Sequence, residues 1–115
     1  MTKRSVICDA WDVVVVPFPF SDRRDTKRRP ALCLSGRSFN QHGHTILTMI
    51  TSAQDPWQGD HVINDAAAAG LRHPCRVRLK VFTLDNRLVL RRLGALVPAD
   101  RQAVAASLRS CLAAL

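Results

Sequence analysis

The pattern that most restricts the chemistry of this chain is a dense run of cations between two apolar segments. Five arginines and lysines occur within residues 23–29, between the apolar stretches 11–18 and 30–35. Cationic groups on a loop are suited to contact phosphate oxygens, and an arginine fork can hold two of them at once. The run predicts a phosphate-contacting loop. It leaves open whether the chain only binds nucleic acid or also cleaves it.

The charge of the whole chain favours the same class of partner. The formal net charge is +8 in 115 residues, which raises the local concentration of a polyanion through long-range attraction. The cations are 14 arginines and 3 lysines, and all nine acids are aspartates. A GC-rich genome also enriches arginine, so arginine content alone does not separate a phosphate-binding function from codon bias. Nucleic acid is the expected partner.

Short strands are expected to position this loop. The β-branched run Val13 to Val16 within residues 11–18 predicts a buried strand, which Pro17 and Pro19 end because proline donates no ladder hydrogen bond. The loop then covers residues 21–29. Further strands are expected at residues 30–35, 44–51, 61–63, 75–79 and 88–93.

Two helical segments are expected after the fourth strand and at the end of the chain. Residues 65–71 predict one or two turns, with Asp65 as the N-cap and Gly70 as a left-handed C-cap. After Pro98, apolar residues recur at helical spacing through Val104 and Leu108. The sequence therefore predicts a mainly β fold with one C-terminal amphipathic helix.

Composition limits the broad class of the protein. With 47% hydrophobic and 23% charged residues, the chain fits a single folded domain over residues 1–115, with residues 1–10 as a loose lead-in. The cysteines are too far apart in sequence for a zinc or redox motif, and we expect free thiols in a reducing cytosol. No apolar run approaches the roughly 18 residues of a membrane span, and residues 1–9 lack a secretory signal. We expect a cytoplasmic protein without a membrane partner.

Six short motifs occur in a fixed order. They are D-V-V-x-V-P-F-P-F-S-D from residue 12, K-R-R-P-A-L-x-L-S from 27, I-T-S from 50, A-G-L from 69, F-T-L-D from 82 and R-R-L-G-x-L from 91. In this order the chain resembles the MazF/PemK family of toxins from type II toxin–antitoxin systems, over about residues 11–115.

The resemblance implies a fold, an activity and partners. The implied fold is a small SH3-like β-barrel of the MazF/PemK/CcdB-like type with a C-terminal helix, in a homodimer. The implied activity is cleavage of single-stranded RNA at short motifs, with no metal and no cofactor. The implied partners are the RNA substrate and a cognate antitoxin that covers the RNA groove. Contact with operator DNA is implied only together with that antitoxin.

Two residues are implied to be catalytic. Metal-free cleavage uses the neighbouring 2′-OH as nucleophile, so the protein must help remove its proton and stabilise charge on the phosphate. Arg29, in R-R-P, matches the family's catalytic arginine, and its fork would hold the phosphate. Thr51, in M-I-T-S, matches the catalytic threonine or serine, and its hydroxyl would orient the phosphate or the 2′-OH. The alternatives are a solvated loop charge for Arg29 and a strand-end cap for Thr51.

Other residues are expected to contact RNA without taking part in the chemistry. Lys27 and Arg28 are interpreted as electrostatic support beside Arg29. The remaining expected RNA contacts are Arg24, Ser52, Phe20 and Arg78. Trp11 is expected to pack on the barrel or at an interface, although an exposed ring there could stack on a base.

Three positions depart from the family's pattern. Glycine usually precedes the first-strand aspartate, whereas Trp11 precedes Asp12 here, which puts in doubt the tight entry that glycine allows. Cys75 stands where serine is frequent, and nothing in the sequence makes it a nucleophile. Many relatives carry Arg-x-Asp before T-L-D, but residues 76–80 contain no aspartate. The proton acceptor is therefore unassigned.

The sequence alone does not identify a histidine as the proton acceptor. Histidine titrates in the useful range, yet His61 and His73 match no family position. His42 and His44, in Q-H-G-H, have the spacing of a chelating pair without an evident third ligand. We therefore expect no metal site.

The missing aspartate leaves a second function open. The chain could be a catalytically weak or inactive relative that binds RNA, or operator DNA together with its antitoxin. A third possibility is a CcdB-like inhibitor of DNA gyrase, which shares the fold and acts through its C-terminal helix. The chain ends in S-L-R-S-C-L-A-A-L, without the C-terminal tryptophan of that group. The sequence identifies neither the RNA motif nor the antitoxin.

Overall fold

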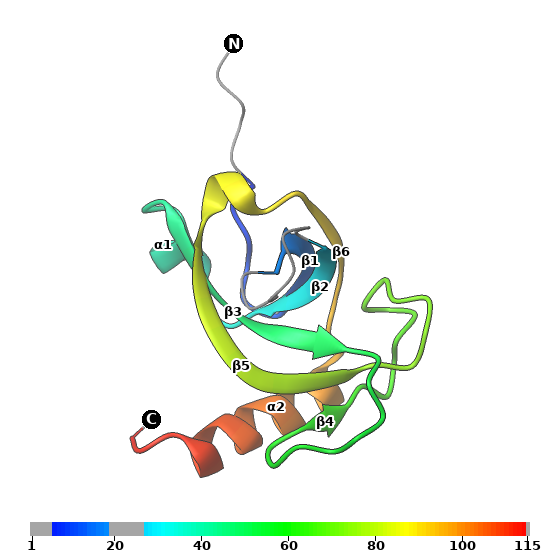
Figure 1. Cartoon of the computed structure of the whole chain (residues 1–115). Helices are drawn as coiled ribbons and strands as arrows, with labels where there is room; N and C mark the ends of the chain where they lie inside the picture. Colours follow the sequence, from blue (N-terminus) through cyan, green and yellow to red (C-terminus); the bar gives the residue numbers. More distant parts are fainter. Residues whose placement is uncertain (1–5, 19–26, 115) are drawn as a thin grey trace.

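Six antiparallel strands form a curled sheet, in the order β4-β5-β3-β2-β1-β6, with one long helix packed outside the curl (Figure 1). The structure is a computed structural model that describes residues 6–18 and 27–114. Most of the predicted cationic loop, including Phe20 and Arg24, lies outside the described residues. The elements are β1 Asp12–Pro17, β2 Arg28–Cys33, α1 Arg37–Asn40, β3 His44–Thr51, β4 His61–Val62, β5 Arg76–Asp85, the 3-10 turn η1 Asn86–Leu88, β6 Arg91–Ala95 and α2 Pro98–Cys111. The expected mainly β, barrel-like fold with a C-terminal helix is confirmed.

Each face of the sheet has its own apolar cluster. Side chains alternate between faces along a strand, so Val14 and Val16 of β1 enter one cluster, whereas Val13 enters the other. The second cluster includes Ile50 of β3 and is completed by Val104 of α2. Burial on both faces explains why β1 is a continuous β-branched run and not an alternating one.

The second half of the sheet differs from the prediction. β5 continues to Asp85, beyond the expected end at residue 79, and Phe82 and Leu84 bury their side chains in the first cluster. The pairing of β5 with β3 shifts register next to Thr48, which marks a bulge. β6 begins at Arg91 and not at residue 88, because residues 86–88 form the 3-10 turn. The helix α1 falls between the second and third expected strands, where no helix was predicted.

Residues 65–71 form hydrogen-bonded turns and not a regular helix. The Asp65 carboxylate accepts a hydrogen bond from the Ala68 amide at 3.0 Å, and Gly70 has a φ of +73°, as the capping pattern predicts. A Cβ on Gly70 would lie 2.2 Å from the Leu93 carbonyl oxygen, and one on Gly94 would lie 2.4 Å from that of Ala68. The backbones of this turn and of β6 are therefore in direct contact. This contact positions the segment that follows the turn.

Trp11 takes the conformation that a glycine would normally supply. Its φ is +74°, in the left-handed region that costs a residue with a side chain about 1 to 2 kcal/mol. Its amide donates to the Cys33 carbonyl at 2.8 Å, and its carbonyl accepts from the Leu96 amide at 3.0 Å. The indole packs against the second cluster, which confirms that this tryptophan packs on the barrel. The tight entry into β1 is kept despite the missing glycine.

All four cysteines are free thiols, as expected; Cys8 and Cys33 are buried, and Cys111 is exposed. Within the described residues, no helix is both long and apolar enough to cross a membrane.

Candidate nucleic-acid interface

Three adjoining depressions form a groove beside β2 and β3. The first has a volume of about 480 Å³ and the second of about 380 Å³, and Arg29 and Arg91 line both. The third, of about 280 Å³, shares Ser52 and His73 with the second. The polar residues that line this groove are Arg28, Arg29, Thr51, Ser52, Gln54, Arg72, His73, Cys75, Arg76 and Arg91.

The groove has a strongly cationic lining. Among the described residues that line it, none is an aspartate. Five arginines of the described chain pair with carboxylates, whereas four that line the groove form no ion pair with another described residue. These four are Arg28, Arg29, Arg72 and Arg91. A cleft lined by charge of one sign concentrates the opposite charge, so the groove is suited to a polyanion.

Sheet pairing brings the two predicted catalytic residues together. Arg29 lies opposite Val16 in the pairing of β1 with β2. The pairing of β2 with β3 runs from Cys33 opposite Leu47 to Ala31 opposite Met49, two residues short of Arg29 and of Thr51. Both residues line the second depression, although 22 positions separate them in the chain.

Thr51 is buried, and its hydroxyl oxygen accepts a hydrogen bond from the Ala53 amide at 3.1 Å. This bond is the turn-capping role that the sequence offered as an alternative. It uses Thr51 only as an acceptor, so the hydroxyl proton remains available for donation to a phosphate or to a 2′-oxygen. Capping and substrate orientation are therefore compatible.

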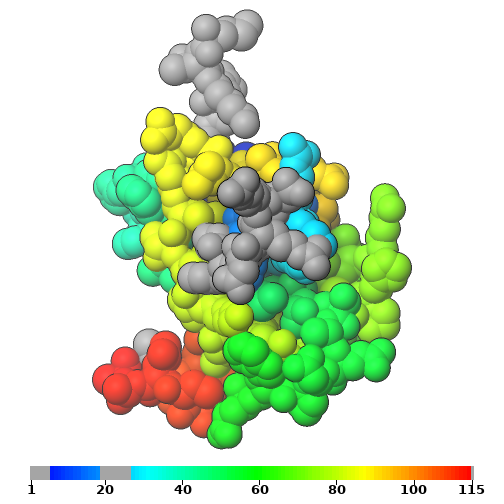
Figure 2. All heavy atoms as spheres, viewed as in Figure 1, coloured from blue at the N-terminus to red at the C-terminus, as the bar shows by residue number. Residues whose placement is uncertain are grey.

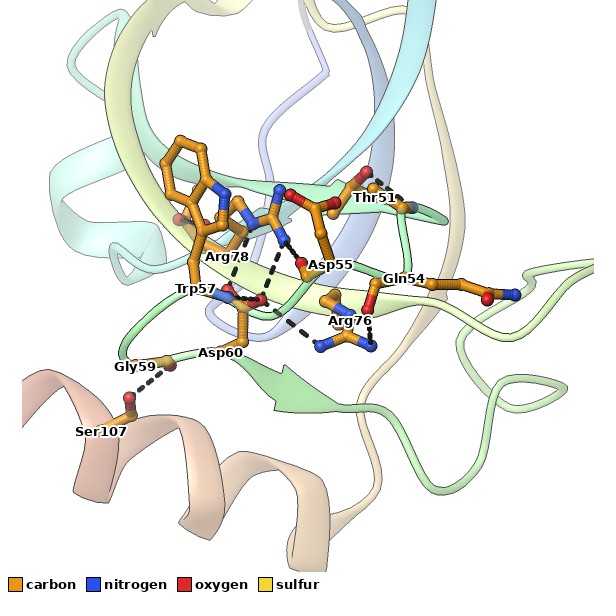
Figure 3. Close-up of polar contacts among 11 residues, drawn as sticks. Thr51, Gln54, Asp55, Trp57, Gly59, Asp60, Arg76, Arg78 and Ser107 are labelled. Atoms are coloured by element: carbon orange, nitrogen blue, oxygen red, sulfur yellow. Dashed lines mark hydrogen bonds and ion pairs between the residues drawn. The ribbon is translucent and has the colours of Figure 1, made fainter.

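Arg78, an expected RNA contact, is instead held inside the protein. Its side chain is 5% exposed, and its guanidinium bonds the Asp60 carboxylate at 3.0 and 3.3 Å and the Asp55 carbonyl at 2.6 Å (Figure 3). Arg76, on the same strand, lies 3.6 Å from Asp60 and donates to the Gln54 carbonyl. Through these bonds Arg78 holds the segment between β3 and β4 against β5. Its contact with RNA stays a prediction.

Asp60 does not replace the aspartate that is missing from residues 76–80. Burial alone would raise the pKa of its carboxyl. Hydrogen bonds from Arg78 and from the Trp57 amide, with the charges of Arg78 and Arg76, nevertheless hold this pKa below its usual range. Asp60 is thus ionised, and its oxygens are occupied. It is not among the residues that line the groove.

His73 was not identified as a site residue from the sequence. It lines the second and third depressions, and it shares the second with Arg29 and Thr51. Its placement depends on the contact between Gly70 and β6, which no local pattern shows. The one feature of the sequence that could have indicated His73 is its position two residues after the A-G-L motif, in the segment L-R-H-P.

Cys75 lines the same two depressions, and burial raises the pKa of its thiol. A thiol held in its protonated form is a poor nucleophile. This agrees with the expectation that Cys75 does not act as one.

The other predicted RNA contacts lie at the groove or beside it. Arg28 is exposed and lines the first depression, and Ser52 is exposed and lines the second and third. Lys27 is exposed directly before β2. Among the described residues, no three His, Cys or Asp side chains are grouped as metal ligands.

The fold and the groove together define a small, half-barrel β protein with a cationic face. The chain belongs to the family of PemK-like, MazF-like toxins of type II toxin–antitoxin systems, whose model matches residues 9–112. The comparison with curated proteins gives no match.

Solved structures of this family share the fold. The chain aligns with MazF in the MazE–MazF complex (Form-III) from Deinococcus radiodurans with a TM-score of 0.77 and 21% identity, over 96% of this chain and 100% of that one. It aligns with the Mycobacterium tuberculosis toxin MazF-mt6 with a TM-score of 0.71 and 19% identity, over 86% and 93%. An endoribonuclease in complex with its cognate antitoxin, from a mycobacterial species, gives 0.73 and 14% identity, over 90% and 92%.

Proposed function

We propose that this toxin is a metal-independent endoribonuclease that cleaves single-stranded RNA, in particular mRNA, at short sequence motifs. One observation carries the proposal: Arg29, which makes no ion pair within the described chain, shares a cationic depression with Thr51. A phosphate in that depression would meet a guanidinium fork and a hydroxyl donor at once. Arg28, Lys27, Ser52 and Arg91 add affinity for the flanking phosphates.

The reaction is a transesterification within the RNA. The 2′-oxygen attacks the adjacent phosphorus, the bond from phosphorus to the 5′-oxygen breaks, and the products are a 2′,3′-cyclic phosphate and a 5′-OH end. Arg29 stabilises the charge that develops on the phosphate oxygens. The proton of the 2′-OH passes to His73, because this residue lines the same depression as Arg29 and Thr51 and a neutral imidazole has a ring nitrogen that can accept a proton, whereas guanidinium groups have none. The departing 5′-oxygen takes a proton from water or from the imidazolium.

A direct cleavage assay tests the function. The purified chain, incubated with a long unstructured RNA in the presence of a chelator, is expected to give discrete fragments with 5′-OH ends. Arg29→Ala, at equal concentration and with the same unfolding midpoint, is expected to give none. Sequencing of the 5′-OH ends yields the cleavage motif. RNA that stays intact with both proteins contradicts the proposal.

We further propose that the chain acts as a cytoplasmic homodimer, a single domain over residues 1–115, with a cognate antitoxin. The relatives with solved structures include a MazE–MazF complex and an endoribonuclease bound to its cognate antitoxin. An acidic antitoxin segment would complement the groove arginines, which form no ion pair within the described residues, and would cover the groove. Operator DNA would be bound only by the toxin–antitoxin complex.

One observation supports a second function. No carboxylate is found among the described residues that line the groove, so the chain could be an inactive relative that only binds RNA, or operator DNA with its antitoxin. Measuring growth after induced expression distinguishes RNA cleavage from binding without cleavage. Toxicity that is lost in Arg29→Ala supports cleavage, and toxicity that survives the substitution supports binding alone.

A further inference from the structure

Trp57, in the segment between β3 and β4, is a large apolar side chain left at the surface. The residue is 44% exposed, whereas the only other tryptophan of the chain, Trp11, packs against the core. The Arg78 guanidinium lies 4.4 Å from the centre of the Trp57 ring (Figure 3). The Lys80 ammonium lies 5.0 Å from the same ring centre. Cations over the ring face hold it by cation–π attraction.

A network of polar contacts fixes the segment that carries this ring. The Trp57 amide donates to the Asp60 carboxylate at 2.9 Å, and Asp60 in turn pairs with Arg78. At the end of the segment, the Ser107 hydroxyl of α2 donates to the Gly59 carbonyl at 2.6 Å. The segment is anchored to β5 and to the helix, so the ring is held in place before any ligand arrives. Preorganisation of this kind lowers the entropy cost of binding.

The ring stands next to the groove. Ser52, Ala53 and Gln54, at the start of the same segment, line the third depression. Trp57 follows Gln54 by three residues, so their Cα atoms are at most about 11 Å apart. In the space-filling view the green atoms of this segment lie on the visible face, to the right of the red C-terminal helix (Figure 2). A strand leaving the groove at its third depression has this ring within reach.

The chemistry of the ring favours a nucleobase as its ligand. Asp60 balances the charge of Arg78 at 3.0 Å, whereas the Lys80 ammonium over the ring keeps a positive charge, so charge alone does not separate a nucleic acid from an acidic peptide. What it offers is an exposed aromatic surface beside a cationic channel. Proteins that bind single-stranded nucleic acid combine these two features, because the channel follows the phosphates while bases stack on the rings.

We propose that Trp57 is a stacking platform for one base of single-stranded RNA, at a subsite beyond the third depression. The Asp60–Arg78 pair positions the ring and does not itself contact the base. This inference rests on the proposed RNA-binding function. Trp57, which is not one of the two proposed catalytic residues Arg29 and Thr51, would then bind one base on one side of the cleaved bond.

Binding of an uncleavable oligonucleotide tests the inference separately from catalysis. A fluorescently labelled 2′-O-methyl RNA, which includes the mapped cleavage motif, cannot react because its 2′-oxygen is blocked. Trp57→Ala is expected to weaken its binding about 5- to 150-fold, the range for the loss of one base stack, and Trp57→Phe is expected to weaken it less. Phe39→Ala removes an aromatic side chain of similar exposure, 48%, from α1 and is expected to change nothing. Urea midpoints check that each variant is folded.

Abasic residues placed one at a time along the oligonucleotide locate the stacked base. One abasic position is expected to weaken binding to the unaltered chain and to have no further effect on Trp57→Ala, because both changes remove the same contact. Equal affinity of Trp57→Ala and the unaltered chain overturns the inference while leaving the proposed function intact. If Trp57→Ala loses affinity only for a poly-aspartate peptide, the ring serves a protein partner and the inference is wrong. Failure of the unaltered chain to bind the oligonucleotide overturns both proposals.

Discussion

Replacement of Asp60 by asparagine is expected to destabilise the protein strongly, although Asp60 lies outside the groove. The Asp60 side chain is 4% exposed and that of Arg78 is 5% exposed, so the pair is shielded from water. Loss of the negative charge leaves a buried guanidinium uncompensated, which costs about 3 to 5 kcal/mol. Asparagine keeps an oxygen that can accept from the Trp57 amide. We therefore expect a cost at the lower end, about 3 kcal/mol, or about 10 to 15 °C in Tm.

Urea and thermal unfolding followed by circular dichroism measure this effect. Asp85→Asn is the matched control, because it breaks an aspartate–arginine pair of similar length, 2.8 Å, whose Arg87 side chain is 76% exposed. Solvent screens that pair, so little change is expected. The double variant Asp60→Leu with Arg78→Met removes both charges and is expected to recover part of the loss. A loss below about 1 kcal/mol for Asp60→Asn would show that the pair is not buried in solution and would refute the reasoning.

Three further changes test the site and the fold. His73→Gln is expected to lower kcat at neutral pH by about 100-fold or more while RNA affinity stays similar, and an unchanged kcat means that the proton goes elsewhere. Gly70→Ala is expected to cost about 2 to 4 kcal/mol in urea unfolding, because its Cβ meets the Leu93 carbonyl at a left-handed φ, whereas Gly36→Ala adds a Cβ in open space. Burial alone would raise the Asp100 pKa, but hydrogen bonds from the Asn64 amide, the His61 ring and the Asp65 amide lower it. Its contribution to stability is therefore complete above about pH 4 and is lost as pH falls through the folded-state pKa, so the free energy of unfolding should fall less steeply with acid in Asp100→Asn than in the unaltered chain.

Local patterns predicted the elements that local contacts determine. The β-branched run of β1 and the apolar residues of β3 indicated strands, and β3 was predicted with its observed bounds, His44–Thr51. The start of α2 follows from Pro98 at its first position. By contrast, α1 has only four residues, and its Asn40 bonds the carbonyl of Cys8, 32 positions away. No local period marks such an element.

The site was only partly predictable for the same reason. The motif order pointed to Arg29 and Thr51, and the sheet register does bring them to one depression. The burial of Arg78 depends on its pairing with Asp60, 18 positions earlier, which a charge pattern does not reveal. The position of His73 depends on a backbone contact between distant segments.

That contact, between the turn ending at Gly70 and the strand containing Gly94, is made by main-chain atoms and needs only that both positions lack a Cβ. This backbone contact therefore does not depend on the side chains of the next residues, of which Arg72, His73 and Pro74 line the groove. Exchanging residues 72–74, with Leu71 kept because it packs against the second cluster, should leave the barrel equally stable while changing what the groove accepts. Under the proposed function, the choice of RNA target can thus diverge, or be redesigned, at one short segment without compensating changes in the core.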